Sequence, residues 1–182
     1  MKLRNHLVTA LLAAALCVMA PVAVPLGVIP VTLATLGVYL SAGLLGPMGG
    51  CAAVALYLAL GAVGVPVFAG FSGGFQQFAG PTGGFLWGYL LCALVAGLLC
   101  RRWHRPASVA LALGCGAVVL YALGGLWYGL QTGIGLWAVL LTCVAPCLPG
   151  ELVKIAVATA LILSLRERVG RVLTAGIKEQ RL

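Results

Sequence analysis

Long apolar runs, separated by glycine, proline and a few charged residues, dominate the pattern of this chain. A helix that crosses a bilayer needs about 20 mostly apolar residues, and somewhat shorter runs are tolerated. Six runs approach or reach that length, and Pro, Gly or basic residues lie at their ends. They cover residues 7–24, 31–45, 50–64, 81–100, 107–127 and 149–165. The pattern therefore predicts an all-α integral membrane protein, a six-helix transmembrane bundle that forms one domain over residues 1–182.

The composition agrees with a lipid environment. Apolar residues make up 63% of the chain and charged residues only 8%, whereas a soluble domain carries about 25% charged residues. The net charge is +8. The basic residues stand at the ends of predicted helices and are not interleaved with aromatic residues, as they are in nucleic-acid-binding grooves. We therefore expect a membrane protein with no nucleic-acid partner.

The basic residues also indicate how the chain crosses the membrane. With six crossings, ten of the eleven fall on one side. They are Lys2, Arg4, Arg101, Arg102, Arg105, Arg166, Arg168, Arg171, Lys178 and Arg181. The positive-inside rule makes that side cytoplasmic, so we expect both termini in the cytoplasm. A signal peptide is the alternative for the first run, which we expect to stay as an uncleaved span.

The apolar stretch 134–147 is too short for a comfortable span. A full crossing at this point would place the basic C-terminus outside, against the positive-inside rule. We therefore expect a short helix at the outer interface, and a seventh crossing is the alternative.

Lys154 is the one basic residue that topology leaves unexplained, and it stands with Glu151 at the start of the last span. The i, i+3 spacing places both on one helix face, and the helix N-terminus favours an anion. Ionisable residues within membrane helices are costly and usually mark function. The alternative is an interfacial charge pair with Lys154 extended toward water. We expect the pair to bind substrate.

The predicted outer loop, 65–80, is unusual for a connection. From residue 64 to residue 84 the chain holds seven glycines and four phenylalanines, whereas a flexible linker is rich in Ser and poor in Phe. Glycine lets a ligand approach the backbone closely. Neutral hydrogen-bonding groups come from Gln76 and Gln77, and we expect an aromatic wall from Phe71, Phe75, Phe78 and Phe85. The loop therefore predicts a lid or a pocket wall.

An enzyme is a weaker interpretation of the same loop. Residues 70–73 match the GxSG pattern of intramembrane serine proteases, but Ser72 would need a base beside it. Both histidines, His6 and His104, map to the opposite side of the membrane. The seven cysteines form no CxxC pair, and we expect them to be small buried side chains rather than metal ligands. We expect no enzymatic activity, no metal and no cofactor.

Taken together, these segments resemble the BioY family, the biotin-binding S components of energy-coupling-factor (ECF) transporters. The resemblance is carried by the loop, which ends in GPTGG at residues 80–84, and by PGELVK at residues 149–154. Residues 31–37 and 44–47 support it. Two positions depart from the family pattern: Glu151 stands where Asp is usual, and Ala34 stands where Gln is often found.

The resemblance implies a bundle of the ECF S-component type in the plasma membrane of a prokaryote, without an ATPase of its own. The protein would capture biotin from outside. A transmembrane coupling subunit and two cytoplasmic ATPase subunits would then drive its release inward. The small side chains of Ala10 and Ala14, which share a helix face, would dock the coupling subunit; packing within the bundle is the alternative.

The expected site combines the charge pair with the loop. Glu151 can accept a hydrogen bond from a ureido N–H of biotin, and Lys154 can donate to the ureido carbonyl or to the carboxylate. We favour the ureido group for both. The expected substrate-binding residues are Glu151, Lys154, Gln77, Gln76, Phe71, Phe75, Phe85, Gly73, Gly74, Thr82 and Tyr89. The alternatives are an S component for a different small vitamin and a solitary biotin carrier.

Overall fold

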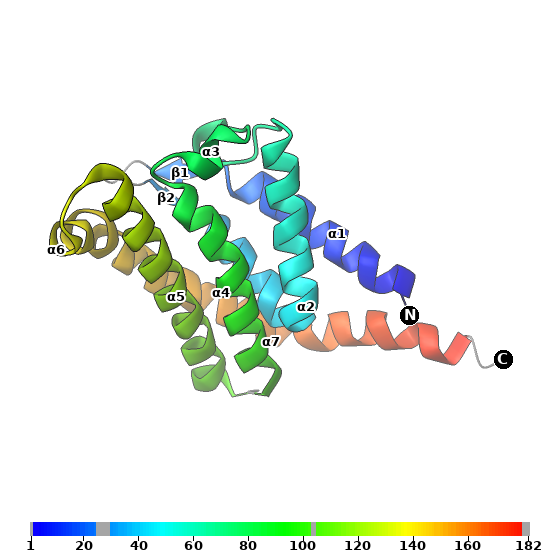
Figure 1. Ribbon diagram of the computed structural model, residues 1–182. Coiled ribbons are helices and arrows are strands. Elements are labelled where there is room, and N and C mark those ends of the chain that lie inside the picture. The colour runs from blue at the N-terminus through cyan, green and yellow to red at the C-terminus, as the bar shows by residue number, and fades with distance from the viewer. Residues whose placement is uncertain (1, 25–29, 103–104, 180–182) are drawn as a thin grey trace.

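The computed structural model describes residues 2–24, 30–102 and 105–179 of the chain. His104 and Arg181, which were named above, lie outside the described residues. The described part is a bundle of α-helices (Figure 1). Its helices are α1 (Lys2–Met19), α2 (Ala34–Ala62), α3 (Gln76–Ala79), α4 (Gly83–Arg102), α5 (Pro106–Thr132), α6 (Leu136–Val139) and α7 (Leu148–Glu179).

Four of the described helical segments are long and apolar enough to cross a membrane. They are Ala34–Ala62, Gly83–Arg102, Pro106–Thr132 and Ala145–Arg166. A shorter apolar segment, Asn5–Met19, lies in α1. The all-α fold agrees with the sequence prediction. The number of crossings depends on whether α2 crosses once or twice and on whether the shorter α1 crosses.

Helix α2 consists of two arms that meet at Gly46. This glycine has φ +73° and ψ −170°, which is not helical, and Pro47 follows it. A straight helix would separate residues 42 and 50 by about 12 Å. Instead, a Cβ placed on Gly50 would lie 2.8 Å from the Cα of Ala42, so the chain reverses and the two arms pack together. The predicted spans 31–45 and 50–64 fall on these two arms except at their outer ends, since residues 31–33 and 63–64 lie outside α2.

The ends of several predicted spans differ from the structure; helix α5, for example, continues to Thr132 rather than ending near residue 127. Helix α1 ends at Met19 rather than near residue 24, because Pro21 lacks the N–H that a continuing helix needs. Strand β1 (Ala23–Val24) then pairs antiparallel with β2 (Val31–Thr32). Helix α7 continues to Glu179, well beyond the predicted end at residue 165, since polar residues sustain a helix as well as apolar ones do.

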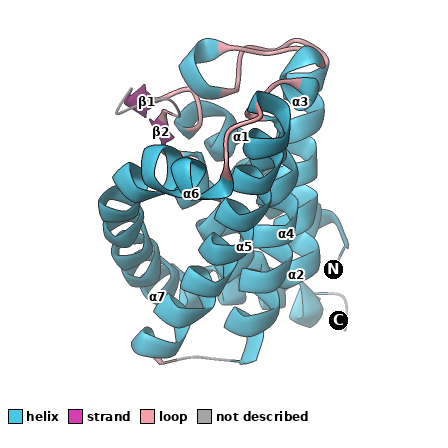
Figure 2. Cartoon of the chain, turned by 60° about the vertical axis from the view of Figure 1, so that its left-hand side comes forward, coloured by secondary structure: helices cyan, strands magenta, loops and turns pink. Residues whose placement is uncertain are grey.

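The stretch 134–147 is a series of short helical turns. Helix α6 is followed by a π-helical turn, Leu140–Val144, and a 3₁₀ turn, Ala145–Cys147, which leads directly into α7. In both views of the molecule, the start of α1 and the end of α7 lie away from the end that carries α3, β1 and β2 (Figures 1 and 2).

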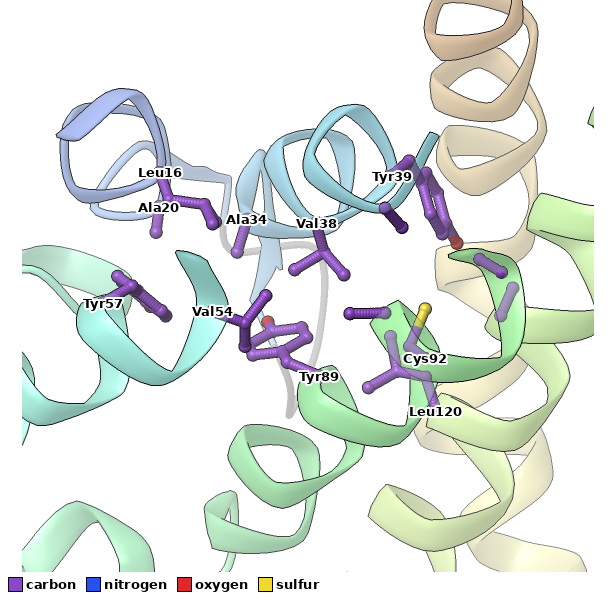
Figure 3. Packing of buried hydrophobic residues seen from close by; sticks show 14 of the residues in the cluster. Leu16, Ala20, Ala34, Val38, Tyr39, Val54, Tyr57, Tyr89, Cys92 and Leu120 are labelled. Atoms are coloured by element: carbon purple, nitrogen blue, oxygen red, sulfur yellow. The ribbon is translucent and has the colours of Figure 1, made fainter. Parts of the chain in front are cut away.

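Glycines allow the central helices to approach closely. A Cβ placed on Gly84 of α4 would lie 2.2 Å from the Cβ of Trp127, and one on Gly88 would lie 2.8 Å from Leu120, both on α5. Such small residues are what membrane helices use where their backbones pack tightly. The core between α1, α2, α4 and α5 is filled by side chains that Figure 3 shows together, among them Leu16, Val38, Val54, Cys92 and Leu120.

Candidate functional site

A cavity of about 200 Å³ lies between the helices and under the loop that precedes α4. Its apolar wall includes Ala20, Ala34, Phe68, Phe85, Leu86 and Leu120. Its polar side chains are Thr32, Thr35, Tyr57, Ser72, Gln77, Thr82, Tyr89, Tyr121 and Lys154. Figure 3 shows the packing around Ala20, Ala34, Tyr57 and Tyr89. A mostly apolar concavity with a few converging polar groups is the usual form of a small-molecule site.

The predicted charge pair is buried in this part of the bundle. Lys154 Nζ lies 3.2 Å from Glu151 Oε2 and forms an ion pair with it. Lys154 also donates a 3.1 Å hydrogen bond to Thr35 Oγ1 on α2. The two side chains are 8% and 2% exposed, which argues against the interfacial alternative in which Lys154 extends into water. A buried charge is tolerated when it is paired and hydrogen-bonded, and both conditions hold for this pair.

The carboxylate of Glu151 receives hydrogen bonds from three helices. Tyr39 of α2 donates to Oε1 at 2.6 Å, and Tyr121 of α5 donates to Oε2 at 2.9 Å. Thr35 donates to Oε2 at 3.4 Å, and Lys154 donates to the same oxygen. These contacts join residues that are up to 116 positions apart in the chain. Glu151 is therefore the point at which α2, α5 and α7 are tied together.

The loop between α2 and α4 is held by backbone and side-chain hydrogen bonds. Gly74, at φ +104°, donates its N–H to the carbonyl of Gly61 at 2.7 Å. The indole of Trp127 donates to the Gly80 carbonyl at 3.0 Å, and the amide of Gln131 donates to the Ala79 carbonyl at 3.1 Å. The loop is thus anchored on α2 and α5, and several of its residues form one wall of the cavity.

Five of the predicted substrate-binding residues line the cavity. They are Gln77, Thr82, Phe85, Tyr89 and Lys154. Gln77 lies in α3 and Thr82 just before α4, Phe85 and Tyr89 lie in α4, and Lys154 lies in α7. The fold therefore brings together residues that are separated in sequence.

The other predicted residues do not line the cavity in the part of the chain that the structure describes. Phe71 and Phe75 are each 71% exposed at the loop surface. Gln76 is exposed, and its amide donates to the carbonyl of Gly73, while Gly74 shapes the loop backbone. Their role in substrate binding stays a prediction.

Glu151 is not among the described residues that line the cavity, and Phe78 packs edge-on between Phe68 and Trp87. Phe68 lines the cavity, whereas the sequence suggested Phe71, Phe75 and Phe78 for the aromatic wall.

Several side chains of the site were not found from the sequence. Tyr39, Tyr57 and Tyr121 lie within apolar runs, where a tyrosine is also a common packing residue. Thr35 and Tyr39 are four residues apart and share one face of α2, which was the available signal. The shared face indicates a binding role for Thr35 and Tyr39 only once the structure shows that Glu151 of α7 lies opposite it.

The predicted docking residues lie on the open side of α1. Ala10 and Ala14 are exposed, together with Leu7, Leu11 and Val18. The buried face of α1 is formed by other residues, including Ala13 and Leu16. The two alanines therefore do not serve packing within the described bundle.

The comparison with known families decides the affiliation of the chain. The sequence model of the BioY family matches residues 1–171. The chain belongs to the BioY family.

This member of the BioY family has similar relatives that are named as biotin transporters or probable biotin transporters. The biotin transporter BioY of Rhodobacter capsulatus is 45% identical over 150 residues, which cover 74% of this chain and 78% of the relative. The probable biotin transporter BioY of Pyrococcus horikoshii is 35% identical over 166 residues, which cover 91% and 97%. These relatives are transporters, so the protease interpretation of Ser72 is not supported; its hydroxyl donates to the Ala69 carbonyl at 2.9 Å.

A solved structure shares the fold. The crystal structure of the S-component for biotin from an ECF-type ABC transporter matches with a TM-score of 0.83 at 23% sequence identity. The match covers 91% of this chain and 92% of the other. The BioY protein therefore has the ECF S-component fold.

Proposed function

We propose that this BioY protein captures biotin on the outer side of the plasma membrane and delivers it inward as the substrate-binding subunit of an ATP-driven ECF transporter. The observation that carries the proposal is Lys154, a buried cation that lines a cavity whose other described lining residues are apolar or neutral. Biotin transporters among its relatives, and the biotin S-component that shares its fold, support the choice of substrate.

The cavity offers a chemical partner for each part of biotin. Lys154 can donate to the ureido carbonyl, and Phe68 and Phe85 can pack against the apolar thioether ring. Gln77 and Thr82, which lie in or beside the loop, can donate hydrogen bonds to the carboxylate of the tail. Several directed donors among apolar walls give such a site both orientation and specificity.

Charge balance favours the ureido group as the partner of Lys154. The ion pair with Glu151 is neutral as a unit. A carboxylate brought against it would leave a net negative charge in a region of low dielectric, which is costly, whereas the neutral ureido ring keeps the balance. We therefore place the ureido ring at α7 and the carboxylate near the loop.

Titration of the purified protein in detergent by calorimetry tests the proposal. We expect saturable binding of biotin. Lys154→Ala should weaken it by about tenfold to a hundredfold, as for loss of a hydrogen bond to a charged group, while Arg102→Gln, an exposed charge away from the cavity, should leave it unchanged. Biotin amide, which lacks the tail charge, should lose as much affinity in Lys154→Ala as biotin does, whereas it would lose clearly less than biotin if Lys154 bound the carboxylate. Wild-type protein that binds another vitamin but not biotin would overturn the substrate assignment.

For the membrane arrangement we propose six crossings, made by α1, the two arms of α2, α4, α5 and α7, with both termini in the cytoplasm. The positions of the basic residues support this orientation. In a cysteine-free variant that still binds biotin, Gly135→Cys should react with an impermeant maleimide from outside and Arg105→Cys only after lysis. A Cβ at Gly135 meets no atom within 4 Å, so that substitution is sterically mild. The reverse labelling pattern would invert the proposed topology.

The partners that we propose are membrane lipid around the bundle, a transmembrane coupling subunit at the Ala10 and Ala14 face, and two cytoplasmic ATPase subunits. The exposure of that face supports the docking position. Biotin uptake by cells that contain the protein but no ATPase module would favour the alternative of a solitary carrier.

A further inference from the structure

We infer that Glu151 does not contact the substrate but positions Lys154, and that Tyr39 is the residue that holds Glu151 in place for this task. Glu151, Tyr39, Tyr121 and Thr35 are called the carboxylate clamp below. The inference rests on the proposed function, because it takes the ureido ring of biotin as the group that Lys154 binds.

The carboxylate oxygen of Glu151 that faces Lys154 is already saturated by the protein. A carboxylate oxygen has about two lone-pair positions, and Oε2 accepts from three donors, Tyr121, Thr35 and Lys154. The other oxygen, Oε1, accepts from the buried Tyr39 hydroxyl, and the Glu151 side chain is only 2% exposed. Glu151 also lies outside the set of described residues that line the cavity.

Lys154 is in the opposite situation. Its ammonium group has three N–H donors, and two of them are directed at Glu151 Oε2 and Thr35 Oγ1. Lys154 lines the cavity, so the third donor is available to a carbonyl of the substrate. The two residues therefore have different roles: Lys154 contacts the ligand, and Glu151 is the fixed counter-charge of Lys154.

Tyr39 is the clamp residue whose role can be isolated. Its side chain is fully buried at 0% exposure, and its hydroxyl makes the shortest of the four bonds to Glu151, at 2.6 Å. Tyr39 does not line the cavity, whereas Tyr121 and Thr35 do. Figure 3 shows its hydroxyl turned away from Val38 and toward the helices opposite α2. We therefore expect an effect of removing this hydroxyl on substrate affinity to pass through Glu151, and the double substitution below tests whether it continues through Lys154.

The test compares Tyr39→Phe with Tyr128→Phe by calorimetry of the full chain. Tyr128 is a buried tyrosine on α5 that does not line the cavity, which makes it a matched control. We expect Tyr39→Phe to weaken biotin binding about tenfold and Tyr128→Phe to leave it unchanged. The Tyr39→Phe effect should shrink for 2-thiobiotin, in which sulfur, a weak acceptor, replaces the ureido oxygen.

A double substitution separates positioning from packing. In a Lys154→Gln background, Tyr39→Phe should cause no further loss, because the group through which it acts is gone. Equal losses in the presence and absence of Lys154, equal losses for biotin and 2-thiobiotin, or an unchanged affinity in Tyr39→Phe would each overturn the inference. Wild-type protein that does not bind biotin would instead overturn the proposed function, and this control is measured first.

Discussion

The indole N–H of Trp127 donates a 3.0 Å hydrogen bond to the carbonyl of Gly80 and so ties α5 to the loop that covers the cavity. Trp127 Cβ also lies against Gly84, at the start of α4. Trp127 therefore helps to fix the wall above the cavity from a neighbouring helix. Gln131 adds a second tie, to the carbonyl of Ala79, one residue earlier.

This tie leads to the first prediction. Trp127→Phe keeps an aromatic ring but removes the donor, and we expect biotin to dissociate several-fold to about tenfold faster, as for loss of one neutral hydrogen bond. Stopped-flow or filter-binding measurement of the dissociation rate in detergent checks this. Trp137→Phe is the control, since Trp137 is 74% exposed on α6 and should change nothing. Equal rates for Trp127→Phe and the wild type would show that the loop is held without this bond.

The aromatic wall gives the second prediction. Phe85 lines the cavity and packs edge-on against Tyr121 with ring centroids 6.2 Å apart, whereas Phe71 is exposed at the loop surface. Phe85→Ala removes apolar contact with the ligand, and burial of a phenylalanine side chain is worth about 1.5–3 kcal/mol. We expect about a tenfold to a hundredfold loss of biotin affinity in Phe85→Ala.

Phe71→Ala is the matched comparison, and its affinity should stay within about threefold of the wild type. Calorimetry on both variants, with circular dichroism as a check on folding, decides between the two residues. A larger loss in Phe71→Ala than in Phe85→Ala would mean that the loop closes over the ligand in the way the sequence pattern suggested.

The reversal of α2 gives the third prediction, which concerns stability. Gly46 has φ +73° and ψ −170°, a conformation that is essentially restricted to glycine. A Cβ at this position would meet no atom within 4 Å, so the cost of Gly46→Ala comes from the backbone alone. We expect a destabilisation of about 1–3 kcal/mol.

Gly114 of α5 provides the contrast. It also has nothing within 4 Å of an added Cβ, but its backbone is helical. Gly114→Ala should be neutral or stabilise by up to about 1 kcal/mol, since alanine loses less freedom in a helix. Thermal unfolding in one detergent compares both variants with the wild type. A similar transition temperature for the two would show that the turn at Gly46 tolerates a side chain.

These features show where sequence reasoning succeeded and where it could not. Lys154 was recognisable because it is the basic residue that the topology left unexplained, and this reasoning needs no knowledge of the packing. The tyrosine that completes the clamp lies 112 positions before Glu151, and only the packing of α2 against α7 brings the two together. Local spacing carries no information about such a contact.

The loop illustrates a different limit. Its phenylalanines at 68, 71, 75 and 78 are chemically equivalent in the sequence, and their spacing does not fit one regular element. Positive φ values at Gly70 and Gly74 turn the backbone so that Phe68 faces the cavity while Phe71 and Phe75 face outward. At the first span, the helix ends before Pro21, and the short β1–β2 ribbon takes the place of the predicted end of the span.

The exposed face of α1 gives the last prediction. Ala10 and Ala14 lie one turn apart among exposed residues, and small side chains at this spacing let the backbone of another helix come close. In Ala14→Leu the larger side chain would hold a partner helix away, so co-purification of the coupling subunit that we propose as partner should fall by about tenfold or more. Biotin binding by the isolated protein should be unchanged, because Ala14 does not line the cavity. Ala55→Leu, at an exposed alanine of α2, is the control for a larger apolar side chain in lipid. Full assembly of Ala14→Leu would mean that this face of α1 meets lipid and that the coupling subunit docks elsewhere.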